Sequence, residues 1–379
     1  MRQSIARRSV VVAGVGLHPF GRFPEKSTEQ MVQEATQAAL ADAGVGFGDV
    51  EIAYYAHMYY QGASPGERFL APFGLTGIPM VNVENACSSG TTAIWQAYWA
   101  VATGQFDCAL VVGSERVPRG PVAVTAEDDP QRFVGDDHMM ATYALRMRRY
   151  IASYGAPVEA IAGIAVKAHR NAVHNPYAQY KKEFTLDDVL GSRMIAEPLT
   201  LYQCCPTSEG AAAAVLVAED ALPRRADGRP AVYVRAAALT TERYHSRGID
   251  NPDSVAAAAE EAFHQAGISA REVDLVQVHD AATIGEVLRI ESLGLVPKGE
   301  GWAASQSGAT ALGGELPVNT DGGLLAMGHP FGASGIRMLH ETVVQIRGLA
   351  GPRQVKDAKT GLVQCSGAGG VCTVIIASR

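Results

Sequence analysis

Cys87 has a sequence environment suited to nucleophilic chemistry. It lies in residues 85–90 (NACSSG), between residues 79–84, which predict a strand, and residues 88–103, which predict a helix. A thiol at the start of a helix is close to unpaired amides and to the positive end of the helix dipole, which favour the thiolate. Cys87 is therefore a candidate nucleophile. A buried structural cysteine is the alternative that its position alone leaves open.

His329 is a candidate base for such a thiol. It lies in a glycine-rich stretch, residues 322–335, that leads into a predicted helix over residues 333–347. A histidine held between small residues and facing a ligand suits the removal of a thiol proton. A structural histidine at a glycine-rich turn is one alternative. A phosphate-binding loop is another, although the Lys and Ser/Thr of a Walker sequence are missing.

His279 and Cys365 could complete the site. His279, followed by Asp280, comes at the end of a predicted strand over residues 273–278, and such strand ends face the ligand crevice of open α/β sheets. Cys365 is followed by the small residues 366–370, which could offer close backbone N–H donors beside a thiol. Each signal is weak alone, because structural histidines and glycine-rich hairpins are common.

The chain that carries these residues alternates short β-rich runs with alanine-rich helical stretches. This alternation predicts an α/β fold in which helices cover parallel sheets. The order helix, Ala-Gly, acidic turn and strand occurs over residues 35–56 and again over residues 258–279, so that Gly44 and Gly267 are 223 residues apart. We therefore predict a duplicated α/β domain.

The division between the halves is expected near the polar, proline-containing residues 223–230. The N-terminal half would then cover residues 1–228 and the C-terminal half residues 229–379. Residues 115–200 exceed an ordinary connection and contain helical patches, which predicts a cap or loop subdomain inserted in the first half.

Composition excludes several classes of protein. Of the 379 residues, 47% are hydrophobic and 19% charged, and the net charge of −7 without a basic stripe argues against nucleic acid as a partner. No apolar run approaches the ~20 residues that span a membrane. Residues 1–8 are basic but lead directly into a short β-branched run, so we expect no targeting peptide. The six cysteines form no CxxC pair, which argues against zinc and disulfides.

Together the motifs resemble the thiolase superfamily, and particularly its sterol-carrier-protein (non-specific lipid-transfer) type, over nearly the whole chain. The resemblance implies a duplicated fold of αβαβα layers. It also implies an acyl-CoA C-acyltransferase that cleaves a 3-oxoacyl-CoA with coenzyme A, or runs the reverse Claisen condensation, through an acyl-cysteine. The segments that carry it are residues 85–90, His279-Asp280, residues 328–335, Cys365, and the subgroup-typical residues 175–180 and 204–210.

The resemblance also implies a role for each residue. Cys87 would hold the acyl group, His329 would take its proton, and Cys365 would move the α-proton or protonate the leaving enolate. His279 stands where many thiolases carry asparagine and would stabilise the enolate oxygen, directly or through a water. The N–H groups of Cys87 and Gly367 would form a second oxyanion hole, in which one donor is typically worth ~3 kcal/mol.

Some expectations concern substrate and context. Ala281-Ala282 stands where the subgroup usually has Cys-Phe, which suggests space for an unusual acyl group; with Gly332 and Gly367 it makes up the expected substrate-binding set. Acyl-CoA and coenzyme A would be substrates, without a cofactor or a metal. We expect a homodimer in lipid metabolism such as β-oxidation. Because no sterol-carrier domain follows and no peroxisomal signal is visible, we expect a cytoplasmic enzyme without a fused lipid carrier.

Other functions remain open. A ketoacyl-synthase-like enzyme uses Cys-His-His, which Cys87, His279 and His329 could supply, but it needs no second thiol such as Cys365. Some lipid-transfer-type relatives are retro-aldolases on CoA thioesters that work with a small zinc-ribbon/OB-fold partner protein and need no acyl-cysteine. A non-catalytic scaffold or lipid-binding relative is the least favoured, because all four catalytic-type positions are intact.

Overall fold

The computed structural model describes residues 7–120, 122, 132, 138–222, 228–243 and 253–379. Part of the expected division between the halves (residues 223–227), part of the expected cap, and residues 1–6 of the N-terminus lie outside the described residues. Among the helices that are described, none is long and apolar enough to cross a membrane.

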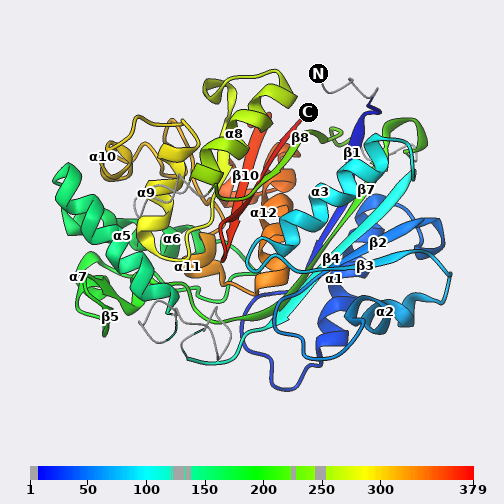
Figure 1. Ribbon diagram of the computed structural model, residues 1–379, viewed down its shortest axis with the longest axis horizontal. Helices are drawn as coiled ribbons and strands as arrows, with labels where there is room; N and C mark the ends of the chain where they lie inside the picture. The colour runs from blue at the N-terminus through cyan, green and yellow to red at the C-terminus, as the bar shows by residue number, and fades with distance from the viewer. Residues whose placement is uncertain (1–6, 121, 123–131, 133–137, 223–227, 244–252) are drawn as a thin grey trace.

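A mixed sheet of nine strands forms the centre of the molecule, in the order β3-β2-β4-β7-β1-β8-β11-β10-β9 (Figure 1). The strands are β1 (Val10–Leu17), β2 (Ile52–Ala56), β3 (Met80–Val83), β4 (Cys108–Arg116), β7 (Glu209–Ala218), β8 (Tyr233–Thr240), β9 (Leu275–Gln277), β10 (Thr360–Gly367) and β11 (Val371–Ser378).

The two parts of this sheet repeat one plan. In the first, β2 is parallel to β4, and β7 and β1 follow as antiparallel neighbours. In the second, β9 is parallel to β10, and β11 and β8 follow as antiparallel neighbours. The parts meet where β1 and β8 pair at Val11 and Tyr233. The predicted duplication of an α/β unit is therefore present.

Helices complete the layers. On the outside, α1 (Thr28–Ala43) packs on β1 and β7, and α8 (Asp253–Ala266) packs on β8 and β11. Between the two parts of the sheet lie α3 (Ser89–Ala102) and α12 (Phe331–Ile346), which contact each other and strands of both parts. Figure 1 shows them side by side at the centre of the molecule. This is the predicted layered α/β fold.

Local sequence explains the ends of α1 and α8. The Ser27 hydroxyl accepts a hydrogen bond from the Gln30 N–H at 3.1 Å, and the Gln30 side chain accepts one from the Ser27 N–H at 2.8 Å, which is a capping box. Gly44 and Gly267 follow the two helices with φ of 72° and 67°, the left-handed conformation that glycine adopts readily.

Glycines allow α3 and α12 to approach closely. A Cβ at Gly90 would lie 2.7 Å from the Gly332 carbonyl oxygen, and one at Gly335 would lie 2.6 Å from the Thr91 nitrogen. No larger residue fits there without separating the helices. Because Cys87 and His329 each come just before one of these helices, the close crossing brings both residues to one place.

The segment between β4 and β7 is helical where it is described. It contains α5 (Met139–Tyr154), α6 (Val158–Val173), α7 (Leu186–Leu190) and a hairpin of β5 (Met194–Ala196) and β6 (Leu199–Thr200). Here α5 packs on α9 (Thr283–Ser292), and α6 packs on α9, α10 (Gly301–Gln306) and α11 (Gly323–Met327). These helices thus cover the loops of the second half; α2 (Pro65–Leu70) lies beside β2 and β3.

Candidate active site

The four residues expected to carry chemistry converge. Cys87, His279 and His329 each place one side-chain nitrogen or sulfur so that all three atoms lie within 4.8 Å of one another, and all three residues are buried. The Cys365 thiol donates a hydrogen bond to the Cys87 carbonyl oxygen at 3.1 Å. These residues come from the start of α3, the ends of β9 and β10, and the turn before α12.

The turn that carries Cys87 is constrained on both sides. Ala86 has φ of 51°, a left-handed conformation that is unfavourable for a residue with a Cβ. The Ser89 hydroxyl donates to the Ala86 carbonyl at 2.6 Å and holds the turn closed. Gly367 lies against it from β10, since a Cβ there would be 2.2 Å from the Asn85 carbonyl oxygen. The hydrogen bond of Ser89 and the contact with Gly367 thus hold the strained turn, and with it the Cys87 thiol, beside the end of β10.

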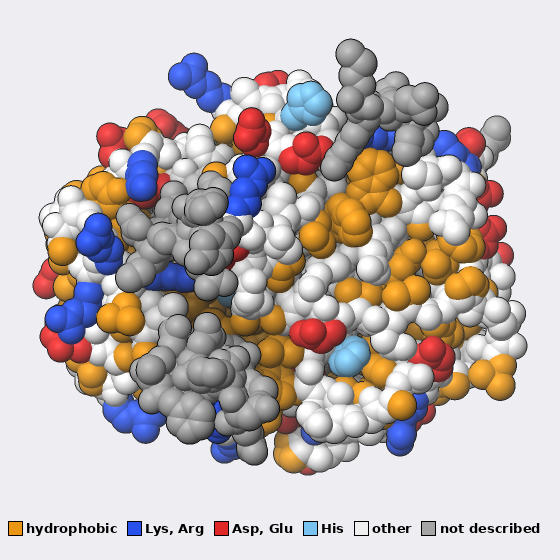
Figure 2. Space-filling view, in the orientation of Figure 1, with side chains coloured by type: hydrophobic (Ala, Val, Ile, Leu, Met, Phe, Trp, Pro, Cys, Tyr) orange, Lys and Arg blue, Asp and Glu red, His pale blue; other side chains and the backbone are white. Residues whose placement is uncertain are grey.

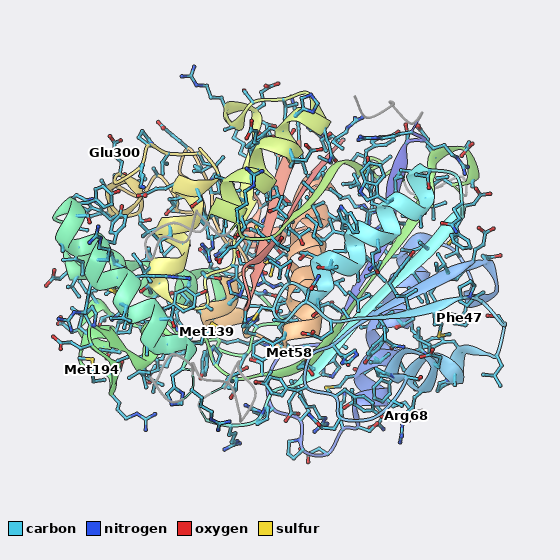
Figure 3. The ribbon with its side chains drawn as sticks, viewed as in Figure 1. Phe47, Met58, Arg68, Met139, Met194 and Glu300 are labelled. Carbon is cyan, nitrogen blue, oxygen red and sulfur yellow. The ribbon has the colours of Figure 1, made fainter. Side chains whose placement is uncertain are left out.

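Cys87 packs in a small apolar cluster. Its neighbours are Val117 and Phe331, with Met58 and Tyr59 at the edge. Figure 3 shows Met58 near one end of α12, the helix that begins at Phe331. Burial raises the pKa of the Cys87 thiol well above its usual value, whereas its own N–H lowers it. The helix start was expected to favour the thiolate, but desolvation outweighs it, so attack on a carbonyl requires a base.

His329 has the hydrogen bonds that such a base needs. The Ser334 hydroxyl donates its single proton to the Pro330 carbonyl at 2.8 Å, so it must accept from His329 Nδ1–H, 2.7 Å away. The lone pair then lies on Nε2, which is buried and has no partner among the described residues. Burial, followed by the charge of Arg337, lowers the pKa of His329 to about 3, so the imidazole is neutral at pH 7.

The subgroup-typical segments hold these loops in place. The His329 N–H donates to the Ser208 hydroxyl at 2.9 Å, and that hydroxyl donates to Gln179 Oε1 at 2.6 Å. The Cys205 N–H donates to the Ala281 carbonyl at 2.9 Å. Residues 175–180 and 204–210 therefore support the backbone around both histidines.

His279 has the opposite arrangement. Its Nδ1 lies 3.4 Å from the hydroxyl of Tyr143 on α5, and its Nε2 is buried without a partner among the described residues. Burial raises the pKa of Tyr143, which stays protonated and can donate to Nδ1. In the tautomer in which Tyr143 donates, the imidazole proton lies on Nε2. Burial and then His329 lower the pKa of His279, so it is a neutral donor beside the neutral base His329.

Asp280 supports the site from behind. Its Oδ1 accepts the Leu324 N–H at 2.7 Å and so ties the end of β9 to α11. Gly323 is necessary beside it, because a Cβ there would lie 2.1 Å from Asp280 Oδ2. Burial raises the pKa of Asp280 to about 8. Asp280 therefore positions the loop of His279.

The expected substrate-binding residues are all close packed. Ala281 and Ala282 belong to the main hydrophobic core and are 3% and 0% exposed. Gly332 lies between backbones, where a Cβ would be 2.3 Å from the Ala56 carbonyl oxygen. Gly367 lies against the Cys87 turn, as above. Their contacts with substrate stay a prediction.

The three side chains of Cys87, His279 and His329 are also the one group identified among the described residues that could hold a metal ion. A thiolate and two imidazoles are ligands that zinc accepts. The same atoms are those assigned to nucleophile, donor and base, so an ion bound there would compete with that chemistry.

Sequence analysis missed several supporting residues. Ser334 lies in the glycine-rich motif, and a serine four residues after Pro330 at a helix start could have suggested its bond to that carbonyl. Ser208 and Gln179 lie in segments that were noted without a role. Tyr143 had no local signal, because the packing of α5 on α9 brings it to His279.

Two family models match the chain. Residues 10–220 match the family "Thiolase, N-terminal domain", and residues 236–377 match "Thiolase C-terminal domain-like". The chain belongs to the thiolase family. It is therefore an enzyme of the acyltransferase class.

Three proteins are similar to this chain over almost its whole length. An acetyl-CoA acetyltransferase of Methanothermobacter thermautotrophicus is 38% identical and covers 98% of this chain and 100% of its own. Sterol carrier protein 2 of Gallus gallus is 36% identical over 98% of this chain and 72% of its own. A solved structure titled "Ltp2-ChsH2(DUF35) aldolase" has a TM-score of 0.85 at 26% identity, covering 98% of both chains.

Proposed function

We propose that the protein is an acyl-CoA C-acyltransferase that cleaves a 3-oxoacyl-CoA with coenzyme A, or catalyses the reverse condensation, through an acyl-cysteine. The observation that carries the proposal is the pairing of two neutral histidines with opposite roles beside two thiols. His329 offers a lone pair and His279 offers an N–H. Thiolytic cleavage needs one base, one oxyanion donor, one nucleophile and one acid.

In cleavage, the Cys87 thiol gives its proton to His329 Nε2 and its sulfur attacks the 3-oxo carbon. The bond between C2 and C3 breaks, which leaves the acyl group on Cys87 and the electron pair on the departing thioester enolate. The His279 N–H stabilises the enolate oxygen. Cys365 donates its proton to the enolate carbon. The thiol of coenzyme A then gives its proton to the Cys365 thiolate and attacks the acyl-cysteine. The shortened acyl-CoA leaves, and His329 returns its proton to the Cys87 sulfur.

The protonation state of Cys365 suits this step. Burial raises the pKa of its thiol to about 12, so it holds a proton at neutral pH. In the condensation direction Cys365 gives its proton to the coenzyme A thiolate that leaves when Cys87 is acylated. The resulting Cys365 thiolate removes the α-proton, and the His279 N–H stabilises the enolate oxygen that forms. Coenzyme A acts as a substrate, and this chemistry uses neither a cofactor nor a metal. A cytoplasmic role in lipid metabolism such as β-oxidation is part of the proposal.

A retro-aldolase on CoA thioesters is the second candidate, favoured by the similarity to the structure titled as an aldolase. That title also names a DUF35 partner. If this chain is an aldolase, a small zinc-ribbon/OB-fold protein would be its partner, and Cys87 would not be acylated. The intact pair of Cys87 and Cys365 favours the acyltransferase. The same pair disfavours a ketoacyl-synthase-like reaction, which needs no second thiol.

We also propose that the protein is a homodimer that pairs through β3. This strand is at the edge of the sheet, and Val81 on it is 38% exposed. Figure 2 shows hydrophobic side chains gathered over the half that carries α3 and β3. Light scattering should give the mass of two chains. It should give a single chain for Val81→Lys, because a charge on an edge strand opposes pairing.

The reaction is tested by incubating 3-oxoacyl-CoA thioesters of increasing length with coenzyme A. The proposal predicts two CoA thioester products, parallel lines in double-reciprocal plots, and loss of activity in Cys87→Ser but not in Cys108→Ser, a buried cysteine on β4 away from the site. The aldolase instead predicts cleavage of a 3-hydroxyacyl-CoA without added coenzyme A, and activity that survives Cys87→Ser.

A further inference from the structure

Arg289 is a buried cation without a counter-ion among the described residues. It is 2% exposed, and its Nε and Nη1 have no hydrogen-bond partner in the part of the chain that the structure describes. The other buried arginines differ, since each is paired with a carboxylate. These pairs are Arg337 with Asp321, Arg347 with Asp42, and Arg353 with Glu341.

The acidic side chains nearest to Arg289 in sequence bond elsewhere. Glu286 pairs with Lys167. Glu291 accepts the Gly301 N–H at 2.8 Å and the hydroxyl of Tyr150. A buried charge without a partner is strongly unfavourable, so its presence requires an explanation such as a ligand.

The direction of the side chain points to the active site. Helix α9 begins at Thr283, four residues after His279, so the Arg289 backbone lies about 9 Å along the helix from its start. Long side chains of helices lean toward the N-terminus, which brings the guanidinium back toward the first turn. The guanidinium is near enough to the site for its charge to act on Tyr143, His279 and Cys365.

The remaining charges around His279 are also positive. Arg337 and Arg146 act on it together with Arg289, and the Asp321 carboxylate is already held by Arg337 at 2.6 Å. Three residues separate His279 from α9: Asp280, whose carboxyl burial holds protonated with a pKa of about 8, and Ala281 and Ala282, whose side chains are small. Arg337 is balanced by Asp321, so Arg289 is the buried arginine near His279 whose charge no carboxylate among the described residues balances.

We propose that Arg289 binds a carboxylate at the far end of the acyl chain, so that the substrates are CoA thioesters of dicarboxylic acids. This inference rests on the proposed function, since it places the acyl group between Cys87 and α9. The phosphates of coenzyme A do not fit Arg289, because the pantetheine arm holds them far from the thioester carbon. An anion on the acyl group is the one that reaches a guanidinium buried beside His279.

Binding to a Cys87→Ala background tests this without turnover. Calorimetry compares three pairs of thioesters of equal chain length: succinyl- with butyryl-CoA, glutaryl- with pentanoyl-CoA, and adipyl- with hexanoyl-CoA. For at least one pair the carboxylate thioester should bind about ten- to a hundredfold more tightly, the range for a buried charge-assisted hydrogen bond. Arg289→Met should bring the ratio of dissociation constants to about one. Arg289→Lys should retain part of the preference.

Arg148→Met is the matched control, because Arg148 lies on α5 and its side chain is 63% exposed. In this variant the ratio of dissociation constants for each pair should equal that of the parent. Melting temperatures separate binding from folding. Arg289→Met should melt no lower than the parent, whereas Arg337→Met leaves Asp321 buried alone and should melt lower. A ratio near one for all pairs with Arg289 intact, or a preference that survives Arg289→Met, would overturn the inference.

The outcome is distinct from that of the proposed function. A protein that thiolyses 3-oxoacyl-CoA but binds both members of each pair equally keeps its function and loses this inference. A protein that prefers the carboxylates through Arg289 but never transfers an acyl group keeps the inference and loses the function.

Discussion

Replacing Ser334 by alanine should disable His329 as a base while leaving the fold nearly intact. The Ser334 hydroxyl accepts from His329 Nδ1–H at 2.7 Å and thereby keeps the lone pair on Nε2. Without it, the Nδ1–H is buried with no acceptor, which costs about 1–3 kcal/mol. The neutral imidazole avoids this cost by moving its proton to Nε2, which removes the lone pair that Cys87 needs. The imidazolium that forms when Cys87 is deprotonated carries a proton on both nitrogens and cannot avoid it. We therefore expect acylation to slow roughly ten- to a hundredfold.

A matched control lies two turns further along α12. The Thr342 hydroxyl donates to the Met338 carbonyl at 2.9 Å, as Ser334 donates to Pro330 at 2.8 Å, and both residues are fully buried. Thr342→Val removes the same kind of hydroxyl-to-carbonyl bond but none to a histidine. Both variants should lose a similar, small amount of stability, about 1 kcal/mol. Acylation should be slow in Ser334→Ala alone.

The assay is a single-turnover acylation, with the enzyme in excess over acetyl-CoA, in which the acyl-enzyme is followed by rapid quench and intact mass. The pH profile of the acylation rate gives a second readout, because its acidic limb should move in Ser334→Ala if that limb reports the pKa of His329. Equal acylation rates in Ser334→Ala and the parent, or equal slowing in both variants, would refute the tautomer argument.

Three other changes follow from the same site. Cys365→Ala should still acylate at Cys87 but lose condensation, because no thiol moves the α-proton; full condensation would rule that role out. Tyr143→Phe removes the hydroxyl 3.4 Å from His279 Nδ1, so the carbon–carbon step should slow about tenfold, more than acylation does, as rapid quench of each half-reaction would reveal. The raised pKa of Asp280 stabilises the folded protein. This stabilisation is fully present below about pH 4 and is lost as pH rises through about 8. Asp280→Asn does not lose stability in this way. Chemical denaturation should therefore show the free energy of unfolding of the variant rising relative to that of the wild type between these pH values. A difference between the two that does not change with pH would contradict the raised pKa of the buried carboxyl.

Much of the fold could be predicted because its signals are local. The Ala-Gly ends of α1 and α8 are encoded by glycines that adopt φ near 70°, and both occur where the pattern placed them. Strand β2 and its counterpart β9 follow those helices in each half. Such signals need no knowledge of the partner across the sheet.

The convergence of the site residues could not be predicted from local signals, because it depends on contacts between distant segments. Cys87 and His329 meet because Gly90 and Gly335 let α3 and α12 cross closely, which no single segment encodes. The pKa of Cys87 was misjudged for the same reason, since burial by Val117 and Phe331 depends on the tertiary packing. Arg289 has no local signal in the sequence, and only its burial, with no hydrogen-bond partner for Nε and Nη1 among the described residues, makes it unusual.

The most direct test of the account is the mass of the protein after incubation with acyl-CoA. We predict one added acyl group, located on the peptide that contains Cys87, absent in Cys87→Ser, and removed by free coenzyme A. No adduct during turnover, together with activity that survives Cys87→Ser, would contradict the assignment of Cys87 as the acyl acceptor.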